Sequence, residues 1–131
     1  MSQENVAVIR RYIGHFNETG ELAEECFDPE VEFTMRPDGP DPTTYRGLNG
    51  LRDALQGARE AWDSITLDIT DFTDLGEAVV AEGCFRLRGR SSDVELEVRE
   101  AWVYWVQNGR IRQMAEYGSK PEALKAAGLS E

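Results

Sequence analysis

Apolar residues recur at helical spacing in the first half of the chain and at every second position in the second half. Val6, Ile9, Ile13 and Phe16 lie three or four positions apart, which predicts a helix over residues 4–19. Further helices are predicted over residues 21–27 and 48–64 and in a short tail from residue 120. Alternation of Val31, Phe33 and Met35 predicts a strand over residues 31–35.

The second half of the chain has the pattern of four strands joined by short turns. The predicted strands cover residues 65–74, 77–89, 93–107 and 109–118. Apolar and polar side chains alternate along them, and the connections between them are of hairpin length. One connection is Asn108-Gly109, a strong two-residue hairpin signal. Strands joined in this way form an antiparallel meander.

This order of elements predicts an α+β domain with its helices on one side of a curved sheet. The longest predicted strand must bend, because residues 95–107 would span about 40 Å if straight, too long for a compact domain of this size. Its Glu97 and Arg99 are polar, whereas Ala101 and Val103 on the same side are apolar. We therefore expect helices to cover one face of the sheet and another body to pack on its other face.

Composition limits the domain count and the classes of partner. The chain has 131 residues, enough for one domain, with 40% apolar residues, 30% charged residues and a formal net charge of −11. An acidic chain is a poor partner for nucleic acid or an anionic membrane surface. No apolar run approaches the ~20 residues of a membrane span, and the first residues carry no secretory signal. We expect a cytoplasmic protein with reduced thiols at Cys26 and Cys84.

Several short segments resemble the nuclear transport factor 2-like superfold and, within it, SnoaL-like domains. They are VEF (31–33), YRGLNGL (45–51), the NGRI hairpin (108–111) and the EALKAAGL tail (122–129). The resemblance implies a single SnoaL-like domain over residues 1–131, in which a cone-shaped, cystatin-like antiparallel sheet wraps on three N-terminal helices. It also implies a pocket inside the cone and often a dimer partner on the outer sheet face.

The resemblance directs one face of each strand into the cone, where an apolar pocket for a small hydrophobic molecule is expected. The side chains assigned to its lining are Tyr12, Ile13, Phe16, Phe33, Met35, Phe85, Leu87, Glu97, Ala101, Val103, Arg112 and Met114. The outer face receives Val98, Trp102 and Tyr104, which are too apolar to face water. A homodimer through that face is therefore predicted.

Glu116 and Arg99 are the candidate catalytic residues. Glu116 alternates with Arg112 and Met114 on the face assigned to the cone, and burial there would raise its pKa toward neutrality. A carboxyl group with such a pKa suits general acid/base catalysis. Arg99 would hold a substrate oxyanion or carboxylate. The alternative interpretation is a structural ion pair between Glu116 and an arginine, either Arg99 or Arg112.

Comparison with enzymes of this fold narrows the chemistry that the resemblance implies. Where ketosteroid isomerases carry an aspartate base and an oxyanion-hole aspartate, this chain has Met35 and Ala101. Glu116-Tyr117 is similar to the acid–tyrosine pair of limonene epoxide hydrolases, but the chain lacks their Arg-x-Asp companion. We expect an isomerase, cyclase or hydrolase for a small hydrophobic substrate. The alternative is a non-catalytic ligand-binding or dimeric interaction module of the same fold.

No metal and no cofactor are expected. His15 is the only histidine, and neither the cysteines nor the carboxylates are spaced as a metal-binding cluster. The chain also has no glycine-rich phosphate loop and no dinucleotide-binding fingerprint. Any catalysis would therefore be cofactor-independent acid/base chemistry.

Overall fold

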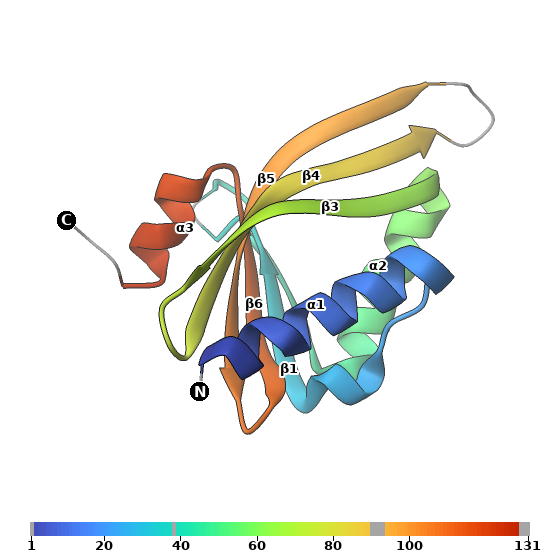
Figure 1. Cartoon of the computed structure of the whole chain (residues 1–131). Coiled ribbons are helices and arrows are strands. Elements are labelled where there is room, and N and C mark those ends of the chain that lie inside the picture. The colour runs from blue at the N-terminus through green and yellow to red at the C-terminus, as the bar shows by residue number, and fades with distance from the viewer. Residues whose placement is uncertain (1, 38, 90–93, 129–131) are drawn as a thin grey trace.

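The computed structural model describes residues 2–37, 39–89 and 94–128 and has one bent sheet with helices against it (Figure 1). Its elements are α1 (Ser2–Thr19), the 3-10 turn η1 (Glu24–Cys26), β1 (Phe27–Met35), β2 (Thr43–Arg46), α2 (Gly47–Ala61), β3 (Trp62–Asp74), β4 (Ala78–Gly89), β5 (Glu95–Gln107), β6 (Arg110–Tyr117) and α3 (Lys120–Ala126). The α+β class is confirmed. Within the described residues, no helix is long and apolar enough to cross a membrane.

The sheet is mixed rather than purely antiparallel, which corrects the prediction. Its six strands follow the order β2-β1-β6-β5-β4-β3, and β1 pairs parallel with β6. The predicted meander of β3 to β6 is confirmed by its antiparallel pairings. Residues 43–46, for which no strand was predicted, form β2, which pairs with β1 from Glu32↔Arg46 to Met35↔Thr43. The predicted second helix is only the 3-10 turn η1.

Two apolar clusters cover the two faces of the sheet. On the concave face, residues of α1 and α2 pack on Val79, Ala81, Tyr104 and Met114. On the opposite face, α3 packs through Ala123 on a second cluster. Figure 1 shows α3 apart from α1 and α2. The strand members of this cluster are Ala78, Val80, Ala101, Val103, Ala115 and Tyr117. The body expected on the outer face therefore includes the chain's own C-terminal helix.

One extra residue in β6 decides which side chains of β5 face the concave side. The hairpin begins with the pairs Gln107↔Arg110 and Val106↔Ile111, but the next pair is Trp105↔Gln113, so Arg112 has no partner on β5. Such a bulge shifts the register by one residue and exchanges the faces that match across the two strands. Trp102, not Ala101, therefore pairs with Glu116.

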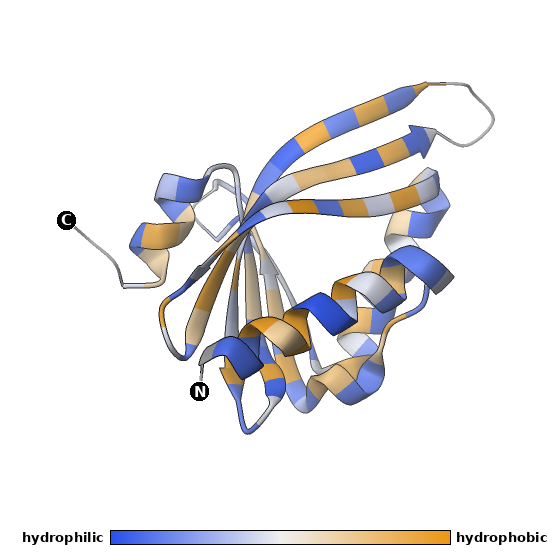
Figure 2. Ribbon diagram, viewed as in Figure 1, coloured by the Kyte–Doolittle hydropathy of each residue, from blue (hydrophilic) through white to orange (hydrophobic). Residues whose placement is uncertain are grey.

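The register shift makes the predicted orientation of β5 wrong. Trp102 and Tyr104 belong to the concave-face cluster, whereas Ala101 and Val103 belong to the outer cluster. The pattern of apolar and polar residues could not reveal the orientation of β5, because residues 100–104 are buried on both faces of the sheet. Toward the N-terminal end of β5 the hydrophobic and hydrophilic positions alternate (Figure 2).

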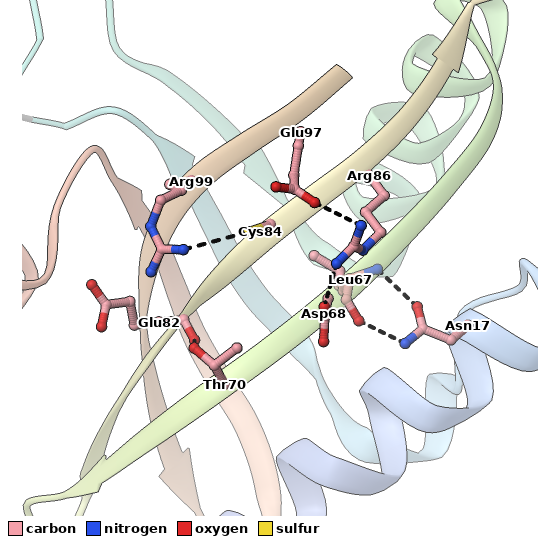
Figure 3. Close-up of polar contacts among 9 residues, drawn as sticks. All are labelled: Asn17, Leu67, Asp68, Thr70, Glu82, Cys84, Arg86, Glu97 and Arg99. Carbon is pink, nitrogen blue, oxygen red and sulfur yellow. Dashed lines mark hydrogen bonds and ion pairs between the residues drawn. The ribbon is translucent and has the colours of Figure 1, made fainter. Parts of the chain in front are cut away.

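Asn17 fixes α1 against the edge strand β3 (Figure 3). Its side-chain Nδ2 donates to the carbonyl oxygen of Leu67 at 2.7 Å, and its Oδ1 accepts from the Leu67 amide at 2.9 Å. The amide group thus satisfies both backbone groups of an edge residue, as a further strand would. This contact holds α1 beside the strand that carries part of the cavity wall.

Gly83 permits the close approach of β4 to β3 where β3 changes register. It pairs with Ile69, just before the irregularity between Ile69 and Asp71. A Cβ atom at Gly83 would overlap the Asp68 carbonyl group and lie 2.7 Å from Ile69 Cα. Only glycine fits here, because the opposing atoms belong to backbone that cannot rotate away.

Replacing Gly83 with alanine should therefore destabilise the fold strongly. We expect Gly83→Ala to lower the free energy of unfolding by about 3 kcal/mol or more, measured by urea denaturation. The matched control is Gly57→Ala in α2, where a Cβ meets nothing within 4 Å. It should raise the stability by about 0.5–1 kcal/mol. Equal effects of the two substitutions would contradict the conclusion that only glycine fits between β4 and β3 at position 83.

Candidate functional site

An apolar cavity of about 130 Å³ lies between the two long helices and the concave face of the sheet. Its lining comprises Tyr12, Phe16, Leu22, Phe33, Leu51, Ala54, Leu55, Ala58, Ile65, Leu67, Phe85, Trp102, Tyr104 and Met114. Because a dry protein cavity of about 150 Å³ binds benzene, this cavity has room for roughly one six-membered ring. Its size favours a small monocyclic ligand.

Aromatic side chains supply most of the polar groups of the lining. The rings of Tyr12 and Tyr104 lie 6.2 Å apart, edge to face, and Trp102 packs edge to face on Phe85 at 5.3 Å. Within the described residues, neither tyrosine hydroxyl makes a hydrogen bond with another protein group. Burial raises the pKa of both tyrosines, so both hydroxyls remain neutral hydrogen-bond donors.

Glu116 lies next to this lining, on the concave face of β6. Its side chain is only 6% exposed, and its Oε2 accepts a hydrogen bond from Trp102 Nε1 at 3.3 Å. It is not itself among the residues that line the cavity. Its charge nevertheless contributes to the raised pKa of Tyr12 and of Tyr104. Glu116 therefore lies beside the cavity, bonded to Trp102, which is part of the lining.

Burial dominates the acid–base properties of Glu116. Desolvation, followed by repulsion from Glu100, raises its pKa from 4.5 to about 7. The hydrogen bond from Trp102 and the charge of Arg36 act in the opposite direction and are outweighed. A carboxyl group with this pKa can both accept and donate a proton near neutral pH.

Arg36 and Glu100 complete the polar group around Glu116. Arg36 Nη2 donates to Glu100 Oε2 at 2.9 Å, and Arg36 Nε lies 4.0 Å from Glu116 Oε1. Glu100 is 6% exposed, and burial raises its pKa although Arg36 lowers it. Two buried carboxyl groups thus share one guanidinium.

Comparison with known proteins identifies the family. A model of the SnoaL-like domain matches residues 9–114. The chain belongs to the SnoaL-like domain family. An uncharacterized protein of Mycobacterium tuberculosis is 30% identical over 125 residues, which cover 91% of this chain and 92% of that protein.

Solved structures share the fold of this SnoaL-like domain. A nuclear transport factor 2-like protein of Burkholderia pseudomallei has a TM-score of 0.75 at 16% identity, covering 93% of this chain and 95% of that one. TerC, co-crystallized with polyporic acid, has a TM-score of 0.77 at 16% identity, covering 93% of this chain and 98% of its own. At this identity the likeness establishes the fold alone.

The structure places five of the predicted pocket residues of this SnoaL-like domain in the cavity lining. These are Tyr12, Phe16, Phe33, Phe85 and Met114. Ile13 is buried in the adjoining core, while Met35 is 36% exposed and, like Leu87, lies outside the lining. Arg112, the bulged residue, forms an ion pair with Asp28 at 3.6 Å and is not a pocket residue.

The predicted pairing of Arg99 with Glu116 is wrong. Arg99 lies on the outer face, where its Nη1 donates to the buried Cys84 Sγ at 3.8 Å (Figure 3). Glu97 is on the same face and pairs with Arg86 at 2.6 Å. Ala101 and Val103 face α3 there. The one-residue bulge in β6 turned all four predicted site residues of β5 away from the cavity.

The predicted dimer surface changes for the same reason. Trp102 and Tyr104 are 3% and 1% exposed and line the cavity, so they cannot bind a partner chain. Val98 is half-buried and pairs with Phe85 at the concave side. The aromatic residues that the pattern assigned to an interface are cavity residues.

The sequence-based reasoning also missed Glu100, Arg36 and the α2 residues of the lining. Leu51, Leu55 and Ala58 lie on one helical face of α2, and this periodicity was available as a signal. Glu100 carried a weaker signal, since it is the single carboxylate among apolar residues on its side of the long strand. Nothing in the sequence indicated Arg36, which reaches the site only through the turn after β1.

Glu116 should make the stability of the protein depend on pH. Its pKa is about 7 in the folded chain against 4.5 for the free group, so the folded state binds the proton more tightly. This contribution is fully present below pH 4.5 and is lost as pH rises to about 7, a loss of about 3 kcal/mol. We expect Glu116→Gln to match wild type near pH 4 and to exceed it in stability above pH 7.

The measurement is urea denaturation of both proteins across this pH range. Glu97→Gln is the control, because it removes an exposed, ion-paired carboxylate from the outer face. Because an exposed ion pair contributes little to stability, the free energy of unfolding of this control should stay within about 1 kcal/mol of wild type. A Glu116→Gln variant with a constant stability difference across the range would show that Glu116 titrates as an ordinary carboxylate.

Proposed function

We propose that this SnoaL-like domain binds a small, largely apolar molecule and moves a proton on it through Glu116, without a cofactor. The observation that carries the proposal is a buried carboxyl group with a pKa of about 7, held by Trp102 at the wall of an apolar cavity. Arg99 has no part in it. Isomerisation or cyclisation of an enolisable carbonyl compound needs the fewest groups besides such a carboxyl.

The two tyrosine hydroxyls support an oxygen-bearing ligand. Tyr12 and Tyr104 line the cavity, and their raised pKa values keep them protonated. A carbonyl oxygen placed near them would accept hydrogen bonds that strengthen as enolate charge develops. Glu116 is near enough to both hydroxyls for its charge to act on them. The base therefore lies beside the wall that carries the two donors.

Access to Glu116 requires that the ligand compete with Trp102. The indole lines the cavity and its Nε1–H occupies Glu116 Oε2. A ligand that reaches the carboxyl group must displace this hydrogen bond or enter beside the ring. The hydrogen bond is only one of four influences on Glu116, so its loss would leave the carboxyl group desolvated and protonatable.

A non-catalytic ligand-binding module is the second candidate. It is favoured by the absence of Glu116, and of every other carboxylate in the described chain, from the cavity lining. Binding of a small apolar ring needs only the aromatic and aliphatic walls. The family supports a small-molecule pocket in either case, as does the polyporic acid bound to TerC.

The test uses proton abstraction from simple ketones, which needs no knowledge of the natural substrate. Deuterium incorporation next to the carbonyl of cyclohexanone and 2-tetralone is followed by NMR in D₂O. We expect wild type to accelerate exchange of the one-ring ketone more than that of the two-ring ketone. The rate should rise as Glu116 deprotonates around pH 7, because the carboxylate is the base.

Two variants and a control test the roles of Glu116 and of the cavity. Glu116→Gln should lower the exchange rate by at least about 100-fold while cyclohexanone still binds, and Glu97→Gln should change neither. Ala58→Phe, which fills the cavity wall on α2, should abolish both binding and exchange. Ketone binding without exchange in wild type would establish the binding module instead. Exchange that survives in Glu116→Gln would refute the role of Glu116.

The homodimer and the cytoplasmic location stay predictions. A homodimer through the sheet would use the part of the outer face that α3 leaves uncovered. That part carries charged side chains, among them Arg86, Glu97 and Arg99, so an interface there would be polar rather than aromatic.

A further inference from the structure

Arg36 reaches the site from the turn that follows β1. Its backbone has a left-handed conformation with φ of 54°, which is uncommon for a residue other than glycine. Its amide donates to the carbonyl oxygen of Glu116 at 3.0 Å. The turn therefore fixes the main chain of Arg36 to β6 and directs the guanidinium toward Glu100 and Glu116.

Glu100 has an oxygen without a hydrogen-bond partner in the described chain. Its Oε2 accepts from Arg36 Nη2, but its buried Oε1 has none. An ionised carboxylate that is this deeply buried is costly unless both oxygens are satisfied. Because Glu116 is buried against the same guanidinium, two ionised carboxylates would leave a net negative charge in a desolvated place. One bound proton removes that charge.

Gly118 provides the space in which the guanidinium of Arg36 lies. A Cβ at Gly118 would be 2.8 Å from Arg36 Nη1 and 3.4 Å from Glu122 Oε1. The first distance is too short for a stable contact, and the second is an ordinary one. Alanine at this position would therefore move the flexible end of Arg36 while changing no charge.

We propose that Glu100 and Glu116 form a coupled pair that holds one proton between them, and that Arg36 is the residue that positions the pair. The catalytic use of this pair rests on the proposed function. A pair that holds one proton contains one carboxylate, which is a base, and one protonated carboxyl group, which is an acid. An isomerisation needs both, since a proton leaves one atom of the ligand and a proton is delivered to another. In this scheme Glu100 acts through Glu116 and does not need to contact the ligand.

The groups that face Glu116 come from three parts of the chain. Glu100, Trp102 and Tyr104 lie on β5, Arg36 follows β1, and Tyr12 comes from α1. The tyrosines stay neutral near pH 7, so only Glu100 and Arg36 carry charge there. Protons bound by two such carboxyl groups leave in two steps that belong to the pair rather than to either residue.

The experiment is a ¹³C NMR titration of protein labelled at the glutamate carboxyl carbons, without ligand. We expect wild type to show two linked steps, the upper one near neutral pH, in resonances assigned by their loss in Glu100→Gln and Glu116→Gln. Each of these variants should retain a single step, with a midpoint lower than the upper wild-type step by about one pH unit. Glu97→Gln, which removes an ion-paired carboxylate from the outer face of β5, should leave both steps unchanged.

Gly118→Ala tests Arg36 without altering any ionisable group. By displacing the guanidinium it should raise the upper midpoint, and Arg36→Gln should raise it in the same direction. If Glu100→Gln does not fold, the shift in Gly118→Ala still decides the outcome. An upper midpoint that stays at the wild-type value in both Glu100→Gln and Gly118→Ala would overturn the proposal.

The titration needs neither ligand nor turnover, so the two proposals can fail separately. Linked steps together with no ketone exchange would retain the carboxyl pair and reject the proposed function. Exchange that depends on Glu116 but is accompanied by unlinked titration would retain the proposed function and reject the pair.

Discussion

The bulge at Arg112 is the constraint on which the rest of the site depends. With one residue of β6 left without a partner on β5, Trp102 and Glu100 come to the face that holds Glu116, and Ala101 and Val103 turn to the face that α3 covers. A regular hairpin would place alanine opposite Glu116. The cavity would then lose its indole wall, and Glu116 its hydrogen-bond donor.

The same register brings two buried carboxyl groups to one guanidinium, and a bound proton relieves the repulsion between them. Glu116 and Glu100 are both buried, while a single guanidinium serves both. Desolvation and mutual repulsion exceed the stabilisation from Arg36 and Trp102, so the pKa of Glu116 rises to about 7. Burial of Glu116 costs stability. It also gives the carboxyl group a pKa near neutral pH, where the group can accept and donate protons.

Much of the fold, but less of the site, could be predicted from the sequence. The long helices and the β3–β6 meander follow from strong local periodicity. The inward position of Glu116 follows from the family resemblance, which directs the face of β6 shared with Met114 into the cone. The orientation of β5 does not follow, because both of its faces are apolar near Trp102 and a one-residue bulge leaves no mark in composition. The strand β2, hidden in a segment rich in proline and glycine, and the parallel pairing of β1 with β6 depend on contacts between distant residues.

Glu116 keeps a proton at a pH where ordinary carboxyl groups have lost theirs. Infrared difference spectroscopy of wild type against Glu116→Gln measures this directly, since a protonated carboxyl group has a carbonyl stretch that a carboxylate lacks. We expect wild type to show this band more strongly than the variant at pH 6 and to lose it at pH 8. Identical spectra of the two proteins in the carbonyl region at pH 6 would contradict it.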